Sequence, residues 1–292
     1  MSETKATRLT RETTDGGAEV ATLTLAKPPL NLFDQSMFDA LIEDLAELSA
    51  NPPRALLLRA EGKLVSGGVD VHVFDGLLPP TPPTPSAAVP PVSPTPPTPS
   101  AAVSPAVERG AELWRTLFAQ IIHPLEALPC PVVFAAHGLT LTAAFEIALA
   151  CDIILAAPKA KFGLVETVVG LTPSMGGPQR LAERAGSGRA REFVMTADLY
   201  DAATMAEWGV VNAIHDDVDA AARELTNRLA QGPTRAHAAT KQIIGAWRSG
   251  GVAHADSVTP EVSGALFDTA DLRGAVRSFL EVGPGKATYT GR

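Results

Sequence analysis

The chain has 292 residues, of which 46% are hydrophobic and 19% are charged, as in an ordinary globular protein of one or two domains. Its net charge of −8 argues against a surface for nucleic acid or for an anionic membrane, because both need a basic patch. Its two cysteines, Cys130 and Cys151, lie in apolar stretches, so we expect neither a disulfide framework nor a thiolate metal site.

The first residues of the chain, MSETKATRLTRETTDGG, are polar and mixed in charge. They lack the apolar core of a signal peptide, and no uncharged apolar run in the chain reaches the roughly 18 residues of a membrane span. The scarcity of cysteines also suits a reducing compartment. We therefore predict a soluble, cytoplasmic protein in which residues 1–19 form a flexible N-terminus.

The first ordered pattern is the alternation VATLTLA at residues 20–26, which predicts a strand. Residues 32–52 follow as an amphipathic helix, because apolar residues recur there at helical spacing. These apolar residues are Phe33, Met37, Leu41, Leu45 and Leu48. A second, buried strand is predicted for ALLLRAEG at residues 55–62. Strand, helix and strand in this order indicate a right-handed crossover in an α/β sheet.

The composition changes abruptly over residues 79–105, where the decapeptide PTPPTPSAAV occurs at residues 80–89 and again at 94–103. Such a segment has few groups to bury and few hydrogen-bond donors, so we predict a solvated, partly polyproline-like loop inserted within a domain. A linker between domains is the alternative, although the flanking segments both look like parts of one sheet. A docking site for proline-binding modules is a further possibility.

Regular patterns resume after the insertion. Residues 106–128 predict a helix, and PCPVVFAAHG at residues 129–138 predicts a buried strand. The alanine-containing apolar run at residues 141–150 predicts a helix, and residues 151–163 resemble a strand and hairpin. From Gln179 onward the patterns are mostly helical. The first two thirds of the chain are therefore predicted to be α/β and the last third all-α.

Two glutamates stand out because their neighbours are apolar. Glu146 lies within LTAAFEIALACD, and Glu166 is the only acid in KFGLVETVVGL. Either one alone could simply pair with a basic residue elsewhere in the fold. Together they suggest acid–base chemistry, because burial in apolar surroundings raises a carboxyl pKa toward the range in which protons are both donated and accepted at neutral pH.

Two segments could supply free backbone N–H groups to a ligand. SGGVD, residues 66–70, follows a predicted strand and has a flexible glycine backbone, although two glycines alone usually mark only a tight turn. The helix expected to begin near Thr142 adds donors at the positive end of its dipole. If both sets of donors met one carbonyl oxygen, they would form an oxyanion hole worth roughly 3–4 kcal/mol per donor.

The order of these motifs resembles that of the crotonase superfamily, whose best-known member is enoyl-CoA hydratase. The resemblance is carried by GKLVSGGVD, by the block from Pro129 to Leu181 and by GVVNAI, and it extends from about Val20 to the end apart from the insertion. It implies an α/β fold with a crotonase-like ββα superhelix core and a C-terminal helical trimerisation region. The core would cover residues 20–200, with the insertion at 79–105, and the helical region residues 201–292.

The resemblance also implies roles for particular residues. Glu146 and Glu166 would be catalytic, and the N–H groups of Val69 and Ala143 would form the oxyanion hole. Contacts to the substrate and its coenzyme A would come from Ser66, Gly67, Gly68, Val69, Asp70 and Ala143. In a hydratase the glutamates hold a water that adds to C3 of a 2-enoyl thioester while C2 receives a proton. Coenzyme A is part of this acyl-CoA substrate, and neither a cofactor nor a metal is expected. Relatives are typically homotrimers or dimers of trimers.

Departures from the family pattern leave other activities open. Thr142, Ala143 and Ala144 replace glycines that commonly precede the first catalytic glutamate, and Ser174 stands where many hydratases have glycine. The backbone N–H groups survive these changes, but the added side chains narrow the pocket. One alternative is an enoyl-CoA (delta3-delta2) isomerase, which can operate with a single carboxylate at Glu166, or an enzyme for another crotonase-type reaction of an acyl-CoA. Another is a non-catalytic scaffold, which the retention of two acids in apolar surroundings disfavours.

Several other residues are predicted to have structural roles. His137 is expected to make a structural hydrogen bond, and Asp152 to act as the structural aspartate of the family. Trp114, Trp208 and Trp247 are expected in the core or at an interface rather than stacked on a ligand.

Overall fold

The computed structural model describes residues 5–78 and 104–292, so both copies of the proline-rich decapeptide lie outside the described residues. The strands are β1 (Thr7–Thr13), β2 (Glu19–Leu25), β3 (Ala55–Ala60), β4 (Val132–Ala136), β5 (Leu139–Leu141), β6 (Ile153–Ala156), β7 (Lys161–Gly163), β8 (Tyr200–Asp201) and β9 (Ala213–Ile214). The helices are α1 (Gln35–Ala50), α2 (Pro105–Leu117), α3 (His123–Ala127), α4 (Ala143–Ala150), α5 (Gly177–Ala185), α6 (Ser187–Thr196), α7 (Ala202–Glu207), α8 (Val218–Ala230), α9 (Thr234–Gly264) and α10 (Ala270–Val282). No helix within the described ranges is both long and apolar enough to cross a bilayer.

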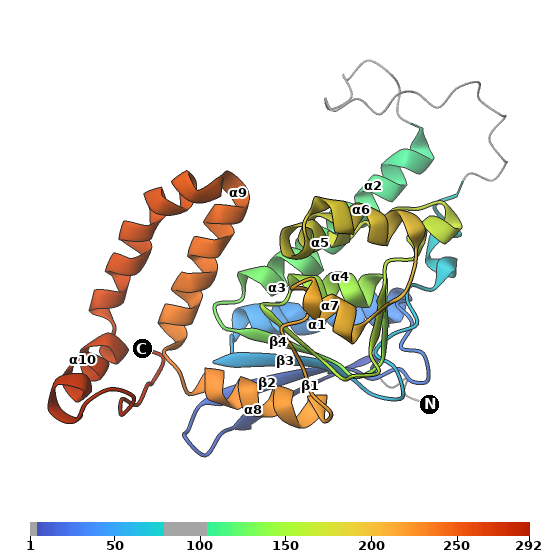
Figure 1. Cartoon of the computed structure of the whole chain (residues 1–292). Helices are drawn as coiled ribbons and strands as arrows, with labels where there is room; N and C mark the ends of the chain where they lie inside the picture. The colour runs from blue at the N-terminus through green and yellow to red at the C-terminus, as the bar shows by residue number, and fades with distance from the viewer. Residues whose placement is uncertain (1–4, 79–103) are drawn as a thin grey trace.

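Six strands form the main sheet in the order β1-β2-β3-β4-β6-β9, in which β1 is antiparallel to β2 and the other pairs are parallel. A second sheet contains β5, β7 and β8, with β7 in the centre. The chain passes from β2 through α1 to the neighbouring, parallel β3, so the predicted strand–helix–strand unit is confirmed (Figure 1). The predicted α/β class is confirmed as well.

Helices cover both faces of the main sheet, which explains why its central strands are apolar along their length. On one face, Leu56 of β3 and Phe134 of β4 belong to the large hydrophobic core that includes α1. On the other face, Leu57 and Val133 pack with buried residues of α8. Alternate residues of each strand therefore face different helices, as the pleat of a strand requires.

The expectation of a flexible N-terminus over residues 1–19 is wrong for residues 7–13. These residues form β1, which pairs with β2 along its whole length. Its sequence, TRLTRET, contains a single apolar residue, so the strand lacks a hydrophobic pattern of its own. It is held instead by its neighbour in the sheet and by Arg11, which makes ion pairs with Glu19 and with Glu47 of α1.

Two other expectations need correction. The hairpin predicted over residues 151–163 is absent, because β6 and β7 lie in different sheets and β7 pairs in parallel with β5. The domain boundary predicted at residue 200 is wrong, because elements that follow it belong to the same core. Helix α8 packs on the main sheet, and β9 is the edge strand of that sheet. A turn between two apolar runs indicates where the chain changes direction. It does not indicate which strands pair, because pairing depends on contacts between residues that are far apart in the sequence.

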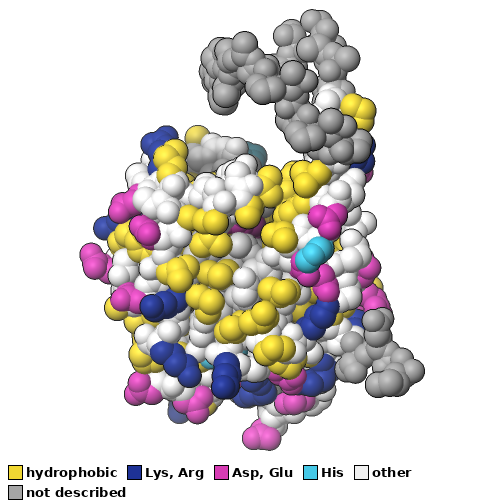
Figure 2. Space-filling model, turned by 90° about the vertical axis from the view of Figure 1, so that its right-hand side faces the viewer, with side chains coloured by type: hydrophobic (Ala, Val, Ile, Leu, Met, Phe, Trp, Pro, Cys, Tyr) yellow, Lys and Arg dark blue, Asp and Glu magenta, His cyan; other side chains and the backbone are white. Residues whose placement is uncertain are grey.

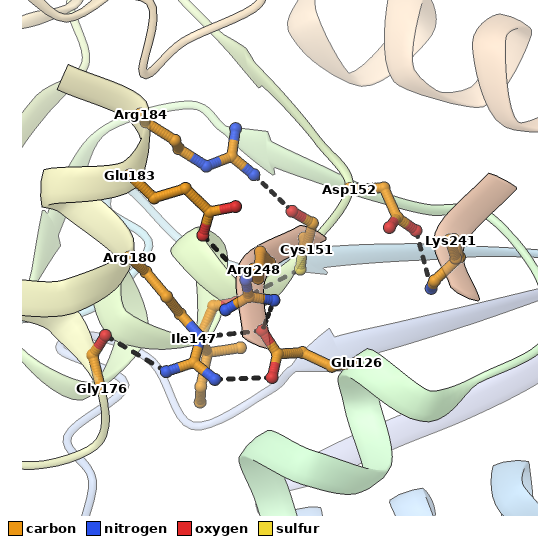
Figure 3. A network of polar contacts seen from close by, with 10 residues as sticks. All are labelled: Glu126, Ile147, Cys151, Asp152, Gly176, Arg180, Glu183, Arg184, Lys241 and Arg248. Carbon is orange, nitrogen blue, oxygen red and sulfur yellow. Dashed lines mark hydrogen bonds and ion pairs between the residues drawn. The ribbon is translucent and has the colours of Figure 1, made fainter. Parts of the chain in front are cut away.

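Helices α9 and α10 form an arm that extends away from the sheet (Figure 1). α9 is kinked at Gly251, whose φ of 73° lies in the left-handed region that glycine adopts readily. Ion pairs fasten the first part of α9 to the core (Figure 3): Arg248 Nη1 lies 2.6 Å from Glu126, and Lys241 Nζ lies 2.9 Å from Asp152. The helical character of the C-terminal region is confirmed, and its part in trimerisation stays a prediction.

Candidate active site

A cavity of about 200 Å³ lies between residues 67–74, helix α2, the start of α4 and residues 165–175. The helical turns Val71–Phe74 and Glu166–Val169 border it, and both lie toward the right-hand side of the molecule in Figure 1. Figure 2 shows this side, on which hydrophobic side chains gather. The structure thus brings together segments that are about a hundred residues apart in the sequence.

Glu146 lies in the first turn of α4 and lines the cavity, although its side chain is almost completely buried. Its Oε1 accepts hydrogen bonds of 2.8 Å from the backbone N–H groups of Met175 and Gly177. Burial raises the pKa of this carboxyl to about 7, whereas the two N–H donors favour its charged form. A Cβ atom at Gly177 would lie 3.0 Å from Oε1, so glycine permits this close approach.

Glu166 begins the helical turn after β7 and lines the same cavity. Its Oε2 is buried but has no hydrogen-bond partner among the described residues. Burial, together with the negative charge of Glu146, raises the pKa of this carboxyl to about 8. The two glutamates therefore differ: Glu146 is held in place by backbone donors, and Glu166 has an oxygen available for a ligand.

The loop that carries Val69 is held from several sides. The Phe33 N–H donates to the Gly68 carbonyl at 2.9 Å, and the Asp70 N–H donates to the Phe33 carbonyl at 3.0 Å. The Ser66 hydroxyl accepts a hydrogen bond from the Gly68 N–H at 3.0 Å. Within residues 5–78 and 104–292, the Val69 N–H between these contacts donates to no protein acceptor, so it is available to a ligand.

The second segment with a free donor is the start of α4. Ala143 is the first residue of this helix, and its N–H has no protein acceptor in the described part of the chain. Thr142 precedes it with φ 47° and ψ −122°, a conformation that strains a β-branched residue. The Thr142 Oγ1 is buried, has no hydrogen-bond partner in residues 5–78 and 104–292, and lies where a Cβ atom on Gly68 would be only 2.9 Å away. The two segments therefore pack closely against each other.

In the structure, some of the residues predicted to contact the substrate line the cavity and others do not. Gly67, Gly68 and Val69 line the cavity, as do both glutamates. Ser66 and Asp70 do not line it: the Ser66 hydroxyl donates to the Asn31 carbonyl at 2.7 Å, and the Asp70 carboxylate caps the next helical turn by accepting from the His72 N–H at 3.0 Å. Ala143 is fully buried and is not among the residues that line the cavity, whereas its neighbour Thr142 is.

The sequence interpretation missed part of the cavity wall. Trp114, predicted as a core or interface residue, lines the cavity together with Leu113 and Leu117 of the same helix. Its ring centroid lies 6.0 Å from that of Phe74. The spacing of these α2 residues on one helical face was visible in the sequence. The sequence does not indicate which segment packs against that face of α2, because the proline-rich insertion separates α2 from the segment that precedes it in the chain.

Other structural expectations are confirmed. The His137 Nε2 lies 3.1 Å from the Gly62 carbonyl, and the Asp152 carboxylate accepts from the Val132 N–H at 2.8 Å. Trp208 packs against the main core. Ser174 lines the cavity, and its hydroxyl donates to the Thr172 carbonyl at 2.7 Å, so it adds a polar group to the wall.

The fold and this pair of carboxyls define an α/β protein in which two glutamates with raised pKa values line one cavity. The sequence profile of the family described as enoyl-CoA hydratase/isomerase matches residues 105–291. The chain is 32% identical over 164 residues to the short-chain-enoyl-CoA hydratase of Clostridium acetobutylicum, which covers 56% of this chain and 63% of that protein. It is 29% identical over 265 residues to the 1,2-epoxyphenylacetyl-CoA isomerase of Escherichia coli (strain K12), which covers 89% of this chain and 92% of that protein.

A solved structure of a protein from Streptomyces coelicolor A3(2) superposes with a TM-score of 0.79 at 30% identity, covering 97% of this chain and 94% of its own. The chain belongs to the enoyl-CoA hydratase/isomerase family of the crotonase superfamily. The predicted family and the crotonase fold are therefore confirmed. The matched residues 105–291 include Glu146, Glu166 and Ala143, whereas Val69 lies before them.

Proposed function

We propose that this protein is an enoyl-CoA hydratase, which adds water across the 2,3 double bond of a 2-enoyl-CoA thioester. One observation carries the proposal: Glu146 and Glu166, both with raised pKa values, line one cavity. Two carboxyls that titrate near neutral pH can take a proton from water and give one to carbon in the same cycle.

The environments of the glutamates suggest which acts as base and which as acid. Glu146 is the base, because the N–H groups of Met175 and Gly177 orient its carboxylate and favour the charged form. It takes a proton from water while the water oxygen bonds to C3. Glu166, which has the higher pKa, gives its proton to C2. One water is thereby added, and proton exchange with solvent restores both carboxyls.

Negative charge develops on the thioester oxygen during this addition. The N–H groups of Val69 and Ala143 have no other protein acceptor in the described residues, which supports their role as the oxyanion hole. Donors placed in this way contribute roughly 3–4 kcal/mol each to the stability of the transition state. The replacement of a glycine by Ala143 preserves the backbone donor at this position.

Coenzyme A enters this reaction as part of the acyl-CoA substrate, and the proposed steps need neither a separate cofactor nor a metal. We propose a homotrimer or a dimer of trimers, assembled through the arm of α9 and α10. Phe267 and Leu280 on this arm are 75% and 78% exposed, and apolar surface of this kind favours contact with another subunit. We place the protein in the cytoplasm, without a nucleic-acid or membrane partner.

An enoyl-CoA isomerase is the second candidate. The observation that favours it is the difference between the two acids: Glu166 has an oxygen without a partner among the residues that the structure describes, whereas Glu146 is held by two backbone donors. A single free carboxyl can move a proton between two carbons of the acyl chain and so shift a double bond. The Escherichia coli relative named above is also an isomerase by name.

The experiment that tests the proposal follows both products. Purified protein is incubated with 2-octenoyl-CoA, and we expect the ultraviolet absorbance of the conjugated thioester to fall while the mass rises by one water. An isomerase would instead convert 3-octenoyl-CoA to the 2-isomer without a change in mass. A protein that binds the thioesters but forms neither product fits the scaffold alternative and contradicts the proposal.

A further inference from the structure

The cavity wall combines a few polar groups with a large apolar surface. The polar groups include the carboxyls of Glu146 and Glu166 and the Thr142 hydroxyl, which are the groups expected beside the thioester. Most of the remaining wall is aliphatic or aromatic. This apolar part includes Phe38, Phe74, Leu113, Trp114, Leu117 and Met175. A ligand that fits this wall has one polar functional group, and the rest of it is hydrocarbon.

The charged side chains that line the cavity are acidic, so a second carboxylate on the acyl group is unfavourable there. No lysine, arginine or histidine lines the cavity in the part of the chain that the structure describes. The segment from residue 79 to residue 103 contains no charged residue in its sequence either. A carboxylate at the far end of an acyl chain would therefore be buried against the apolar wall without a cation, which is strongly unfavourable.

The size of the whole cavity and the aromatic side chains in its wall limit the length and kind of the acyl group. The cavity measures about 200 Å³, and an apolar protein cavity of about 150 Å³ admits benzene. The tilted rings of Phe74 and Trp114, with centroids 6.0 Å apart, offer aromatic faces and edges to such a ring. An acyl tail of roughly six to eight carbons, or a phenyl group on a short chain, fills this space.

We propose that the protein takes a neutral acyl-CoA with a single carboxyl function, the thioester, and a medium-length aliphatic or aryl tail that packs on Trp114 and Phe74. The inference rests on the proposed function only in placing the thioester at the two glutamates. Short acyl groups would leave part of the apolar wall in contact with water, and dicarboxylic acyl groups would bring an unpaired charge into it.

The test measures binding rather than turnover, so its outcome is independent of whether the protein is a hydratase. Calorimetry with the full chain compares butyryl-, octanoyl-, 3-phenylpropanoyl- and glutaryl-CoA, none of which can be hydrated. Each buried methylene strengthens binding about fourfold, so we expect octanoyl-CoA and 3-phenylpropanoyl-CoA to bind at least about 20-fold more tightly than butyryl-CoA. Glutaryl-CoA should bind no more tightly than butyryl-CoA. Tighter binding of glutaryl-CoA, or equal affinity for all four thioesters, overturns the proposal.

A pair of variants tests where the acyl tail of the ligand binds in the cavity. Trp114→Ala should weaken octanoyl-CoA about tenfold and butyryl-CoA less than about threefold, because only the longer tail reaches the indole. Val107→Ala is the matched control: it truncates a 60% exposed residue of the same helix outside the cavity wall, and it should change neither affinity. Equal losses for both thioesters in Trp114→Ala, with the far-ultraviolet circular dichroism unchanged, contradict this placement of the tail.

Discussion

The two segments that supply the acids hold them in different ways. Glu146 belongs to α4, an eight-residue helix whose side chains are all buried, and two backbone N–H groups fix its carboxylate. Glu166 belongs to a short helical turn without a buried residue, and one of its oxygens has no partner in the described structure. The site therefore combines a fixed carboxylate with one that is free to meet a ligand.

This difference shows how one cavity can give two similar side chains different environments. Burial raises the pKa of both carboxyls, to about 7 for Glu146 and about 8 for Glu166. The order of the two values follows from the backbone donors on Glu146 and from the negative charge that Glu146 places beside Glu166.

The largest expected effect is the loss of either acid. Glu146→Gln and Glu166→Gln should each lower kcat for hydration of 2-octenoyl-CoA by about a hundredfold or more, because general acid–base catalysis typically contributes that much. Glu224→Gln, at an exposed position on α8, is the control and should keep the wild-type rate. If Glu146→Gln alone retained full turnover, a single-acid isomerase would be the better description.

The second prediction moves the fixed carboxylate without removing it. A Cβ atom at Gly177 would lie 3.0 Å from both Cγ and Oε1 of Glu146, so Gly177→Ala should displace this side chain and lower kcat by about tenfold. Gly188→Ala is a matched control, because a Cβ atom there meets nothing within 4 Å. Steady-state kinetics of both variants test the placement, and wild-type activity in Gly177→Ala would show that the position of Glu146 is not critical.

The third prediction concerns Thr142, whose φ is 47° and whose buried hydroxyl has no partner in the described part of the chain. If this hydroxyl donates to the substrate, Thr142→Val should lower kcat about five- to tenfold, and Thr142→Ser should retain activity. Thr142→Gly should lose activity but raise the melting temperature, since glycine adopts this backbone without strain. Equal activity of the valine and serine variants would limit Thr142 to a packing role.

The fourth prediction is a pH dependence of activity. The value of kcat/KM should rise through about pH 7 as Glu146 ionises and fall through about pH 8 as Glu166 loses its proton. The acidic limb should vanish in Glu146→Gln and the alkaline limb in Glu166→Gln, measured on the residual activity. The same two limbs in either variant would mean that other groups set the profile.

The smallest expected effect is on stability. The pKa of Glu166 is about 8 in the folded chain against an ordinary value of 4.5, so the folded state binds this proton more tightly. Its contribution to stability is complete below pH 4.5 and is lost as the pH rises toward 8. Glu166→Gln cannot ionise, and it should raise the melting temperature by several degrees at pH 9 and leave it unchanged at pH 4. Thermal unfolding at both values checks the sign.

Much of the fold could be predicted from local patterns. The alternating residues of β2, the helical spacing in α1 and the apolar runs of β3 and β4 identify these elements because each buries a regular face. β1 could not be predicted, because its sequence is mostly polar and the strand is defined by its pairing with β2 at the edge of the sheet. The separation of β6 from β7 was missed because strand pairing depends on distant residues.

By itself, the sequence determined which groups are unusual: two lone acids in apolar segments and a glycine turn after a strand. These features can be recognised within a single segment, because the apolar neighbours that bury an acid are close to it in the sequence. Only the tertiary structure decided how these groups differ. The donors to Glu146 come from Met175 and Gly177, about thirty residues away, and Trp114 reaches the cavity from beyond the insertion. Such contacts depend on the packing of whole elements, which no single segment encodes.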